Sequence, residues 1–317
     1  MGRYAARRML QLIPVFFGST LIIFAMVYAI PGDPIRALFG ERQVSEQTIT
    51  ELRERYNLND PFFVQYGKYM GVVPDGEEGL SGVLQGDFGE DFRGREVWEI
   101  MGERFPVTIR LTVAAIIIET IIGVIAGVLA GIRRRSFMDT LVLVSTTVVI
   151  AVPLFVLEFG SQILFGIRLE WFPVAGIRDG AMSYVLPSIL LAATSLAYVA
   201  RLTRTSIAEN MRADYVRTAR AKGLKGERVI GRHVLRNSLI PVITFIGVDI
   251  GALLGGAIVT ETIFNIPGVG RAVFEAVVTR EGAVVVGIIT VLVIVYLLAN
   301  LLVDLLYGVL DPRIRYG

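Results

Sequence analysis

Residues 214–241 read DYVRTARAKGLKGERVIGRHVLRNSLIP, a basic and polar segment between two strongly apolar ones. Asp214 can cap the start of a helix, because its carboxylate can accept hydrogen bonds from the first free amides. Gly223 can end that helix, because glycine accepts the left-handed backbone conformation that a helix stop requires. Leu224 follows, where a hydrophobic contact usually accompanies such a stop. The first half of the segment therefore predicts a short helix with a glycine hinge.

A second helix is predicted after the hinge, from about Gly226–Glu227. Its α-helical spacing puts Ile230 and Val234 on one face. The whole segment is then a helix, a bend and another helix. We interpret this shape as a rigid knob that docks on another protein.

The composition outside this segment is that of a multispanning membrane protein. Hydrophobic residues make up 54% of the 317 residues and charged residues 19%, and several windows exceed eighteen apolar residues. The absence of cysteine excludes disulfides and thiolate metal sites, and with the single histidine, His233, we expect no metal site. Six spans are predicted, at about Met9–Ile30, Val107–Gly131, Leu141–Phe165, Tyr184–Ala200, Asn237–Thr260 and Ala283–Tyr307.

Basic residues predict the orientation of these spans. The termini, the turn at 133–135 and the loop at 201–236 together hold 18 of the 31 lysines and arginines. Because such residues favour the cytoplasmic side, we expect both termini and this loop in the cytoplasm. Residues 31–105 would then form an extracytoplasmic insertion between the first two spans. Within it we expect helices at Glu46–Tyr56 and Pro61–Met70, the second with an aromatic stripe that packs rather than binds a ligand.

Two predicted spans carry a glycine at every fourth position. One set is Gly123, Gly127 and Gly131, and the other is Gly247, Gly251 and Gly255. Glycine at this spacing lets two helix backbones approach closely, so both helices are predicted to face protein rather than lipid. The packing partner can belong to this chain or to a neighbouring subunit.

The 214–224 segment resembles the cytoplasmic loop of the permease subunits of ATP-binding-cassette importers. That loop carries the pattern E-A-A-x-x-x-G. When Gly223 is aligned with the glycine of the pattern, Thr218 and Ala219 stand at the two alanine positions and Arg217 stands at the glutamate position. The substitution at Arg217 is typical of the dipeptide, oligopeptide and nickel branch of the family. Other stretches similar to this branch are 86–89, 260–264, 267–270, 300–307 and 311–313.

The resemblance implies an all-α polytopic subunit of about six spans, like those of type I importers, located in the cell membrane. Its organisation would be residues 1–30, the insertion 31–105 and a permease core, 106–317. The implied partners are a homologous second permease, two ATPase subunits, an extracytoplasmic solute-binding protein, membrane lipid and a peptide substrate, with no nucleic acid. The residues implied to couple transport to ATP hydrolysis are Tyr215, Arg217, Thr218, Ala219, Arg220, Ala221, Lys222, Gly223 and Leu224.

The chain lacks the motifs of an enzyme. The phosphate-binding motif G-x-x-x-x-G-K-[ST] is absent, because Gly67-Lys68 is followed by Tyr69 and preceded by Phe62 where the first glycine should stand. We therefore expect no cofactor in this chain, with ATP and magnesium bound by the partner ATPase subunits. Alternatives to a peptide permease are a nickel or glutathione permease of the same family and, from another class, a proton-coupled secondary transporter.

Acidic residues inside the predicted spans are functional candidates, because burying a charge in a membrane is costly. Glu119 and Asp249 can line a translocation pathway and attract the ammonium group of a peptide, or they can bridge helices or meet water at a subunit interface. For Glu158 and Asp304 we favour the bridging role. No catalytic role is expected for any of them.

The loop after the fifth span is too polar to cross the membrane, yet it is rich in apolar side chains. Such a surface normally finds a packing partner. We predict that it folds into the outer mouth of the pathway, with Glu261, Phe264, Pro267 and Gly268 as a gate. The alternative is a re-entrant plug that only holds the helices together.

Overall fold

The computed structural model describes residues 2–28, 35, 45–75 and 79–310, so residues 29 and 30 of the predicted first span and the 311–313 stretch lie outside the described residues. Over the described part, the backbone forms helices and one isolated antiparallel bridge, between Glu90 and Glu96. The all-α prediction is confirmed. The chain divides into two compact units, Met1–Pro106 with Arg271–Gly317, and Val107–Gly270, and each is described by itself.

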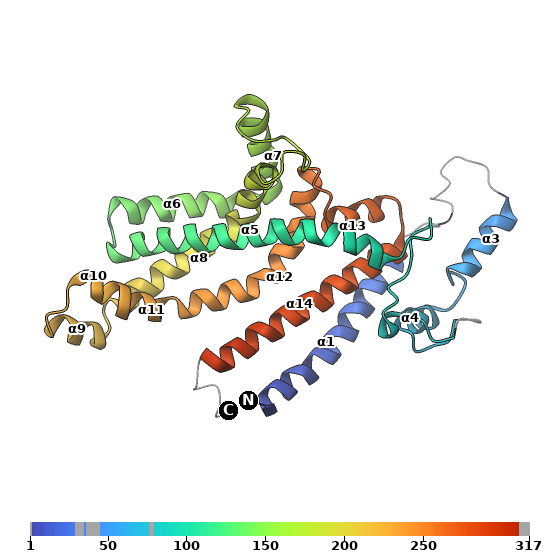
Figure 1. Ribbon diagram of the computed structural model, residues 1–317, viewed down its shortest axis with the longest axis horizontal. Helices are drawn as coiled ribbons and strands as arrows, with labels where there is room; N and C mark the ends of the chain where they lie inside the picture. Colours follow the sequence, from blue (N-terminus) through green and yellow to red (C-terminus); the bar gives the residue numbers. More distant parts are fainter. Residues whose placement is uncertain (1, 29–34, 36–44, 76–78, 311–317) are drawn as a thin grey trace. The chain divides into compact units, whose positions relative to one another are not determined.

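The first unit pairs the start of the chain with its end. Helix α1 lies along α14 (Figure 1). Both expected helices of the insertion are present, as α3 and α4. The elements of this unit are α1 (Gly2–Tyr28), α3 (Glu46–Arg55), α4 (Phe62–Met70), η2 (Val83–Gln85), the first turns of α5 (Val97–Ile132), most of α13 (Val269–Val278), and α14 (Gly282–Leu310).

The aromatic stripe of α4 packs against α1 and α14, as predicted. The ring of Phe24 lies 5.6 Å from that of Phe62, 5.4 Å from Tyr66 and 5.5 Å from Tyr69, measured between centroids. The Tyr69 hydroxyl donates a hydrogen bond of 2.7 Å to Thr290 Oγ1. These rings therefore fasten the insertion to the spans rather than forming an open cage.

The second unit is built around α8, which packs against α6 and α12. The loops between these helices are short except for the stretch before α8 and the basic segment after it. Its elements are the rest of α5, α6 (Phe137–Ala151), α7 (Leu154–Ser161), the π-helical η3 (Gln162–Arg168), α8 (Met182–Asn210), α9 (Asp214–Ala221), α10 (Gly226–Arg228), the π-helical η4 (Val229–Val234), α11 (Leu235–Ser238) and α12 (Ile240–Ile263).

The first glycine stripe packs against α8 of the same chain, which confirms that it faces protein. A Cβ placed on Gly123 would lie 2.7 Å from Val199, and one on Gly127 would lie 2.5 Å from the Ala200 carbonyl oxygen. The backbones of α5 and α8 approach this closely only because these positions lack side chains. The second stripe differs, because a Cβ on Gly255 would meet nothing within 4 Å of the described chain.

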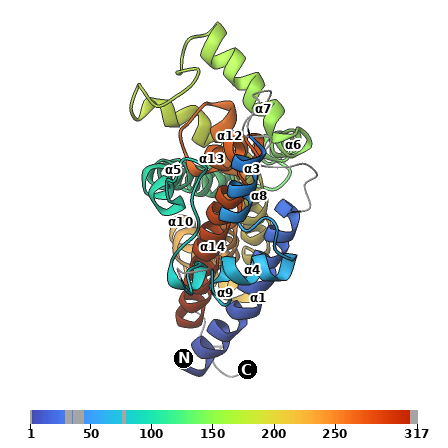
Figure 2. The ribbon, with the colours of Figure 1, turned by 90° about the vertical axis from the view of Figure 1, so that its right-hand side faces the viewer.

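The third predicted span, Leu141–Phe165, is not one continuous helix. It is two segments, Phe137–Ala151 and Leu154–Arg168, that meet at an angle of 100° (Figure 2). Val152 has an extended backbone at the break, with φ −97° and ψ 129°, and Pro153 follows it. Proline disfavours a helical conformation in the residue before it, which explains the break. The apolar segment predicted as the third span is therefore present as a bent pair of helices, and the break at Val152–Pro153 was not predicted.

Length and composition agree with a multispanning membrane protein. Among the described residues, four helices are long and apolar enough to cross a membrane, or up to six when each of two bent pairs counts as one span. The fourth predicted span is longer than expected, because α8 continues to Asn210. The loop predicted from residue 201 therefore begins about ten residues later.

Candidate functional site

The knob predicted at 214–224 begins with α9. Asp214 does not cap this helix, contrary to the prediction. Ala213 is the residue before the first turn, with φ −67° and ψ 149°, and no side chain accepts a hydrogen bond from the free amides there. Asp214 instead lies in the first turn, where its charge favours the helix dipole, and its carboxylate is 3.5 Å from Arg217 Nη1.

The predicted stop at Gly223 is confirmed in its geometry. Gly223 has φ 78°, the left-handed conformation. Its amide donates to the Arg220 carbonyl oxygen at 2.9 Å, and the Leu224 amide donates to that of Ala219 at 3.3 Å. These two bonds satisfy carbonyls that the helix end leaves free, in the arrangement known as a Schellman motif.

The second half of the knob differs in register from the prediction. A helix does begin at Gly226, but it passes into a π-helical segment at Val229–Val234. A π-helix aligns residues five apart, so Val229 and Val234 point the same way. Both are fully buried, whereas Ile230 is only partly buried.

A small apolar cluster holds the knob against the ends of α5 and α8. Its buried members are Ile207, Val216, Ala219, Val229 and Val234. Partly buried residues pack around them, including Ile132 of α5 and Leu224 of the hinge. Burial of one such aliphatic side chain contributes about 1.5–3 kcal/mol. The cluster therefore makes the knob a rigid extension of α5 and α8.

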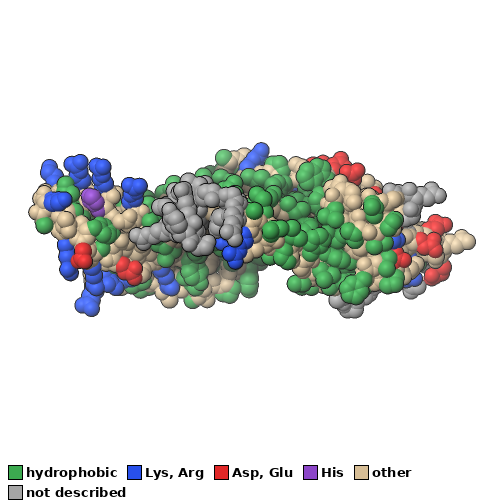
Figure 3. Space-filling view, turned by 90° about the horizontal axis from the view of Figure 1, so that it is seen from below, with side chains coloured by type: hydrophobic (Ala, Val, Ile, Leu, Met, Phe, Trp, Pro, Cys, Tyr) green, Lys and Arg blue, Asp and Glu red, His purple; other side chains and the backbone are tan. Residues whose placement is uncertain are grey.

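Most of the residues predicted to couple transport to ATP hydrolysis lie on the solvent face of the knob. Ala219 is buried and Leu224 is partly buried. The exposed ones are Tyr215, Arg217, Thr218, Arg220, Ala221, Lys222 and Gly223. Figure 3 shows lysine and arginine side chains gathered over this end of the second unit, with the single histidine among them. The knob thus presents a basic, polar surface.

Two arginines that were predicted to lie in the loop belong to α8 and bind α6. The guanidinium of Arg204 contacts both carboxylate oxygens of Asp139, and the Arg135 amide donates to the same carboxylate at 2.7 Å. Arg201 donates to Thr146 Oγ1 at 2.9 Å and to Thr147. No local sequence signal joins these positions, since they lie more than fifty residues apart. The contacts tie α6 to α8 just before the knob.

The structure brings together two acids that the sequence analysis proposed for the pathway. Glu119 of α5 and Asp249 of α12 are buried, and their carboxyl groups interact with each other. Neither Glu119 oxygen has a well-formed hydrogen bond to the described residues. Nothing within the described part of the chain groups three or more acids or histidines to hold a metal ion.

The two acids favoured for bridging do bridge helices. Glu158 of α7 is fully buried and accepts a hydrogen bond from Thr260 Oγ1 of α12. Within the other unit, Asp304 of α14 is 3.3 Å from Arg8 Nε of α1. The bridging role favoured for both residues agrees with these contacts.

The predicted gate residues lie at the end of α12 in a packed environment. Glu261, Phe264 and Gly268 are buried, and Pro267 is partly buried. The Thr108 hydroxyl of α5 donates to Glu261 Oε1 at 2.6 Å and accepts from the Val269 amide at 2.8 Å. One hydroxyl of α5 therefore binds both the end of α12 and the loop that follows it.

Two further contacts fasten this loop within the second unit. The Gly176 amide donates to the Phe264 carbonyl oxygen at 2.8 Å, and Gln162 Nε2 donates to that of Ile263 at 3.2 Å. A Cβ on Gly268 would lie 2.2 Å from Glu261 Oε1, so the loop crosses directly over the carboxylate. Sequence reasoning missed the role of Thr108, which is 153 residues from Glu261.

Comparisons with known proteins agree with this architecture. Residues 123–316 match the binding-protein-dependent transport system inner membrane component, and residues 1–112 match its N-terminal family. The chain is 39% identical to the dipeptide transport system permease protein DppB of Alkalihalophilus pseudofirmus, over 100% of both chains. It is 38% identical to the di/tripeptide transport system permease protein DppB of Pseudomonas aeruginosa, over 100% of this chain and 99% of the relative.

A third relative is named after a different substrate, glutathione. The chain is 36% identical to the glutathione transport system permease protein GsiC of Salmonella typhimurium, over 100% of both chains. These matches span the basic knob, the buried acids and the loop after α12. The chain belongs to the family of inner membrane components of binding-protein-dependent transport systems.

Proposed function

We propose that this chain is the permease subunit of an ATP-binding-cassette importer and that, with a sister permease, it forms a pathway for di- or oligopeptides. The full-length identity with peptide permeases carries this proposal. Glutathione is the second candidate substrate, supported by the 36% identity with GsiC. The family assignment leaves the proton-coupled alternative without support.

The proposed complex contains the sister permease, two ATPase subunits and an extracytoplasmic solute-binding protein. An exposed stripe on α12 supports the sister permease, because Val248, Ala252 and Gly255 lie at helical spacing and are exposed in this chain. Glycine in such a stripe lets a second helix approach closely. This chain lacks a phosphate-binding loop, so we assign ATP and magnesium to the ATPase subunits.

The knob is the proposed coupling element. Its exposed basic face can enter a cleft of an ATPase subunit, while its buried face is packed on α5 and α8. A movement of the ATPase would then shift these helices together, because the apolar cluster resists separate motion. The Arg204–Asp139 pair would pass the same movement to α6.

Copurification tests the proposal. A tagged chain expressed with its neighbouring genes should bring a second permease and ATPase subunits with it through detergent purification. In proteoliposomes the complex should import a dipeptide only with internal ATP and the external binding protein. Uptake driven by a proton gradient alone, with no ATPase subunit bound, would show that the proposal is wrong.

The proposed orientation places both termini and the knob in the cytoplasm. Single-cysteine labelling can check it cleanly, because the chain has no cysteine of its own. An impermeant thiol reagent should label Glu51→Cys in intact cells, and Lys225→Cys only after the membrane is opened. Both positions are exposed, so burial does not confound the comparison. Labelling of Lys225→Cys from outside would reverse the topology and remove the coupling role.

The proposed pathway role of Glu119 and Asp249 makes a separate prediction. If the pair attracts a peptide ammonium group, Glu119→Gln and Asp249→Asn should each lower uptake per assembled complex. If the pair only bridges helices, Glu119→Gln should keep both uptake and thermal stability, because the Gln amide can still donate a hydrogen bond to the Asp249 carboxylate. Uptake and melting temperature measured on the same preparations distinguish the two roles.

A further inference from the structure

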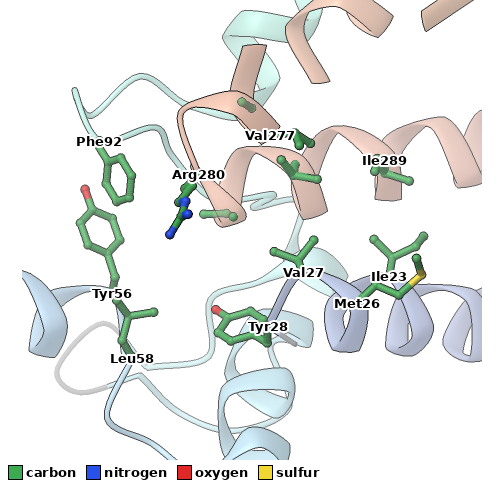
Figure 4. A pocket seen from close by; sticks show the side chains of 14 residues that line it. Ile23, Met26, Val27, Tyr28, Tyr56, Leu58, Phe92, Val277, Arg280 and Ile289 are labelled. Carbon is green, nitrogen blue, oxygen red and sulfur yellow. The ribbon is translucent and has the colours of Figure 1, made fainter. Parts of the chain in front are cut away.

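A cavity of about 550 Å³ lies within the unit formed by Met1–Pro106 and Arg271–Gly317 (Figure 4). Its volume is in the range of sites that hold a small molecule. The walls are mainly aliphatic: Ile23 and Met26 come from α1, Val277 from α13 and Ile289 from α14. This cavity serves neither the knob nor the buried acids, which all lie in the other unit.

Among the described residues, Arg280 is the only charged one that lines the cavity. It lies in the turn between α13 and α14, with φ 59°, and it is exposed. Figure 4 shows its guanidinium pointing into the space between Tyr56 and Tyr28. No acidic side chain of the described residues is within ion-pair distance of it. A guanidinium that has no carboxylate partner can bind an anionic group, and the apolar cavity beside it can hold an apolar chain. Together they suit a ligand that carries both.

The cavity is placed where a membrane meets water. Its lining includes Tyr28, the last residue of the span Ala6–Tyr28, and Gly282, the first residue of the span Gly282–Leu305. Ile23 and Ile289 lie five and seven residues inside these ends. At a helical rise of about 1.5 Å per residue, the cavity reaches roughly 8 to 11 Å into the hydrocarbon layer. Tyrosine and arginine at the boundary suit the headgroup level.

We propose that this cavity binds one glycerophospholipid, with an acyl chain between α1 and α14 and the phosphate on Arg280. The apolar walls match an acyl chain, and the guanidinium matches the phosphate. A transported peptide is a poor occupant, because the cavity offers few partners for buried peptide groups. The lipid belongs to the outer leaflet in the orientation proposed above, but the site does not depend on that orientation.

Photo-crosslinking in proteoliposomes tests the proposal on the complete complex. One probe is a phospholipid with a diazirine in its acyl chain, and the other is diacylglycerol with the same acyl chain and no phosphate. Mass spectrometry of digested protein locates the labelled peptides. We expect the phospholipid probe to label peptides that contain Ile23–Tyr28 and Ala276–Ile289, and to exceed the diacylglycerol probe there.

Two pairs of matched variants make the test specific. Val277→Trp should fill the cavity and remove the labelling, whereas Val278→Trp should not, because Val278 is 65% exposed and lines no part of the cavity. Arg280→Gln should lower the ratio of phospholipid labelling to diacylglycerol labelling by about five-fold, which is the effect of one cation at an anionic headgroup. Arg7→Gln, at an exposed position of α1 sixteen residues before the lining residue Ile23, should leave that preference unchanged.

Three results would overturn the proposal. Equal labelling of Val277→Trp and Val278→Trp would show that lipid does not enter the cavity. An unchanged phosphate preference in Arg280→Gln would remove the role of the guanidinium. A disulfide from Val277→Cys to the sister permease in high yield, without lipid labelling, would show that a protein fills the cavity instead.

Discussion

Replacing Gly223 with valine should abolish ATP-driven uptake while the membrane-spanning helices stay folded and inserted. Gly223 has φ 78°, which a β-branched residue adopts only at a cost of about 1–3 kcal/mol. The chain would relieve the strain by giving up the two hydrogen bonds that end α9. The exposed basic residues beside the hinge would then be displaced. In our proposal these residues bind the ATPase, so the contact with the ATPase would be lost.

Gly226→Val is the matched control for this prediction. It makes the same substitution three residues later, at a position without positive φ and with nothing within 4 Å of the added Cβ. Membrane insertion, ATPase subunits retained through purification and uptake should be measured for both variants. We expect loss of bound ATPase and of uptake in Gly223→Val alone. Normal uptake by Gly223→Val would show that the hinge geometry is not needed for coupling.

Replacing Gly268 with alanine should sharply lower the yield of folded complex. The new Cβ would lie 2.2 to 2.4 Å from the Glu261 carboxylate atoms, so the carboxylate would have to move. Glu261 is fully buried and held by Thr108, so movement breaks this hydrogen bond and leaves buried polar atoms unsatisfied, at a cost of about 1–3 kcal/mol. The Val269 amide of the loop would lose its hydrogen bond to the Thr108 hydroxyl as well.

Gly160→Ala is the matched control, because an added Cβ there meets nothing within 4 Å and the backbone is helical. Complex yield by size-exclusion chromatography should fall for Gly268→Ala and stay unchanged for Gly160→Ala. A yield equal to that of the control would contradict the structural role of the Glu261 contact.

Phe264→Ala then distinguishes a gate from a plug. A gate predicts that the assembled complex shows ATPase activity without the binding protein, because the closed state is lost. A plug predicts that yield and uptake fall together, and that uptake per assembled complex is unchanged. Phe264 is 1% exposed, so truncation should cost about 3–5 kcal/mol in either case. The decisive measurement is therefore ATPase activity per assembled complex.

Features that depend on neighbouring residues could be predicted from the sequence. The stop at Gly223 was predicted because glycine and the apolar Leu224 stand next to each other in the chain. The two insertion helices were predicted from their periodicity, and the structure places them at Glu46–Arg55 and Phe62–Met70. The first glycine stripe was predicted to face protein, and it packs on α8.

Some local features were predicted wrongly or missed, because a second local effect outweighed the one on which the prediction rested. Pro153 breaks the third span, although the surrounding residues are apolar enough to cross the membrane. The π-helical turn after Gly226 buries Val229 instead of Ile230, because its residues align five apart rather than four. Asp214 pairs within the first turn of α9 and leaves the capping position to Ala213.

The sequence by itself determined the all-α class, the apolar segments and the position of the basic knob, since each depends on composition or on spacing along one helix. Only the tertiary structure decided which distant residues meet. Glu119 joins Asp249, Thr108 joins Glu261, and Arg204 joins Asp139. Such pairs are set by how the helices pack, and a single sequence carries no local pattern that records this packing.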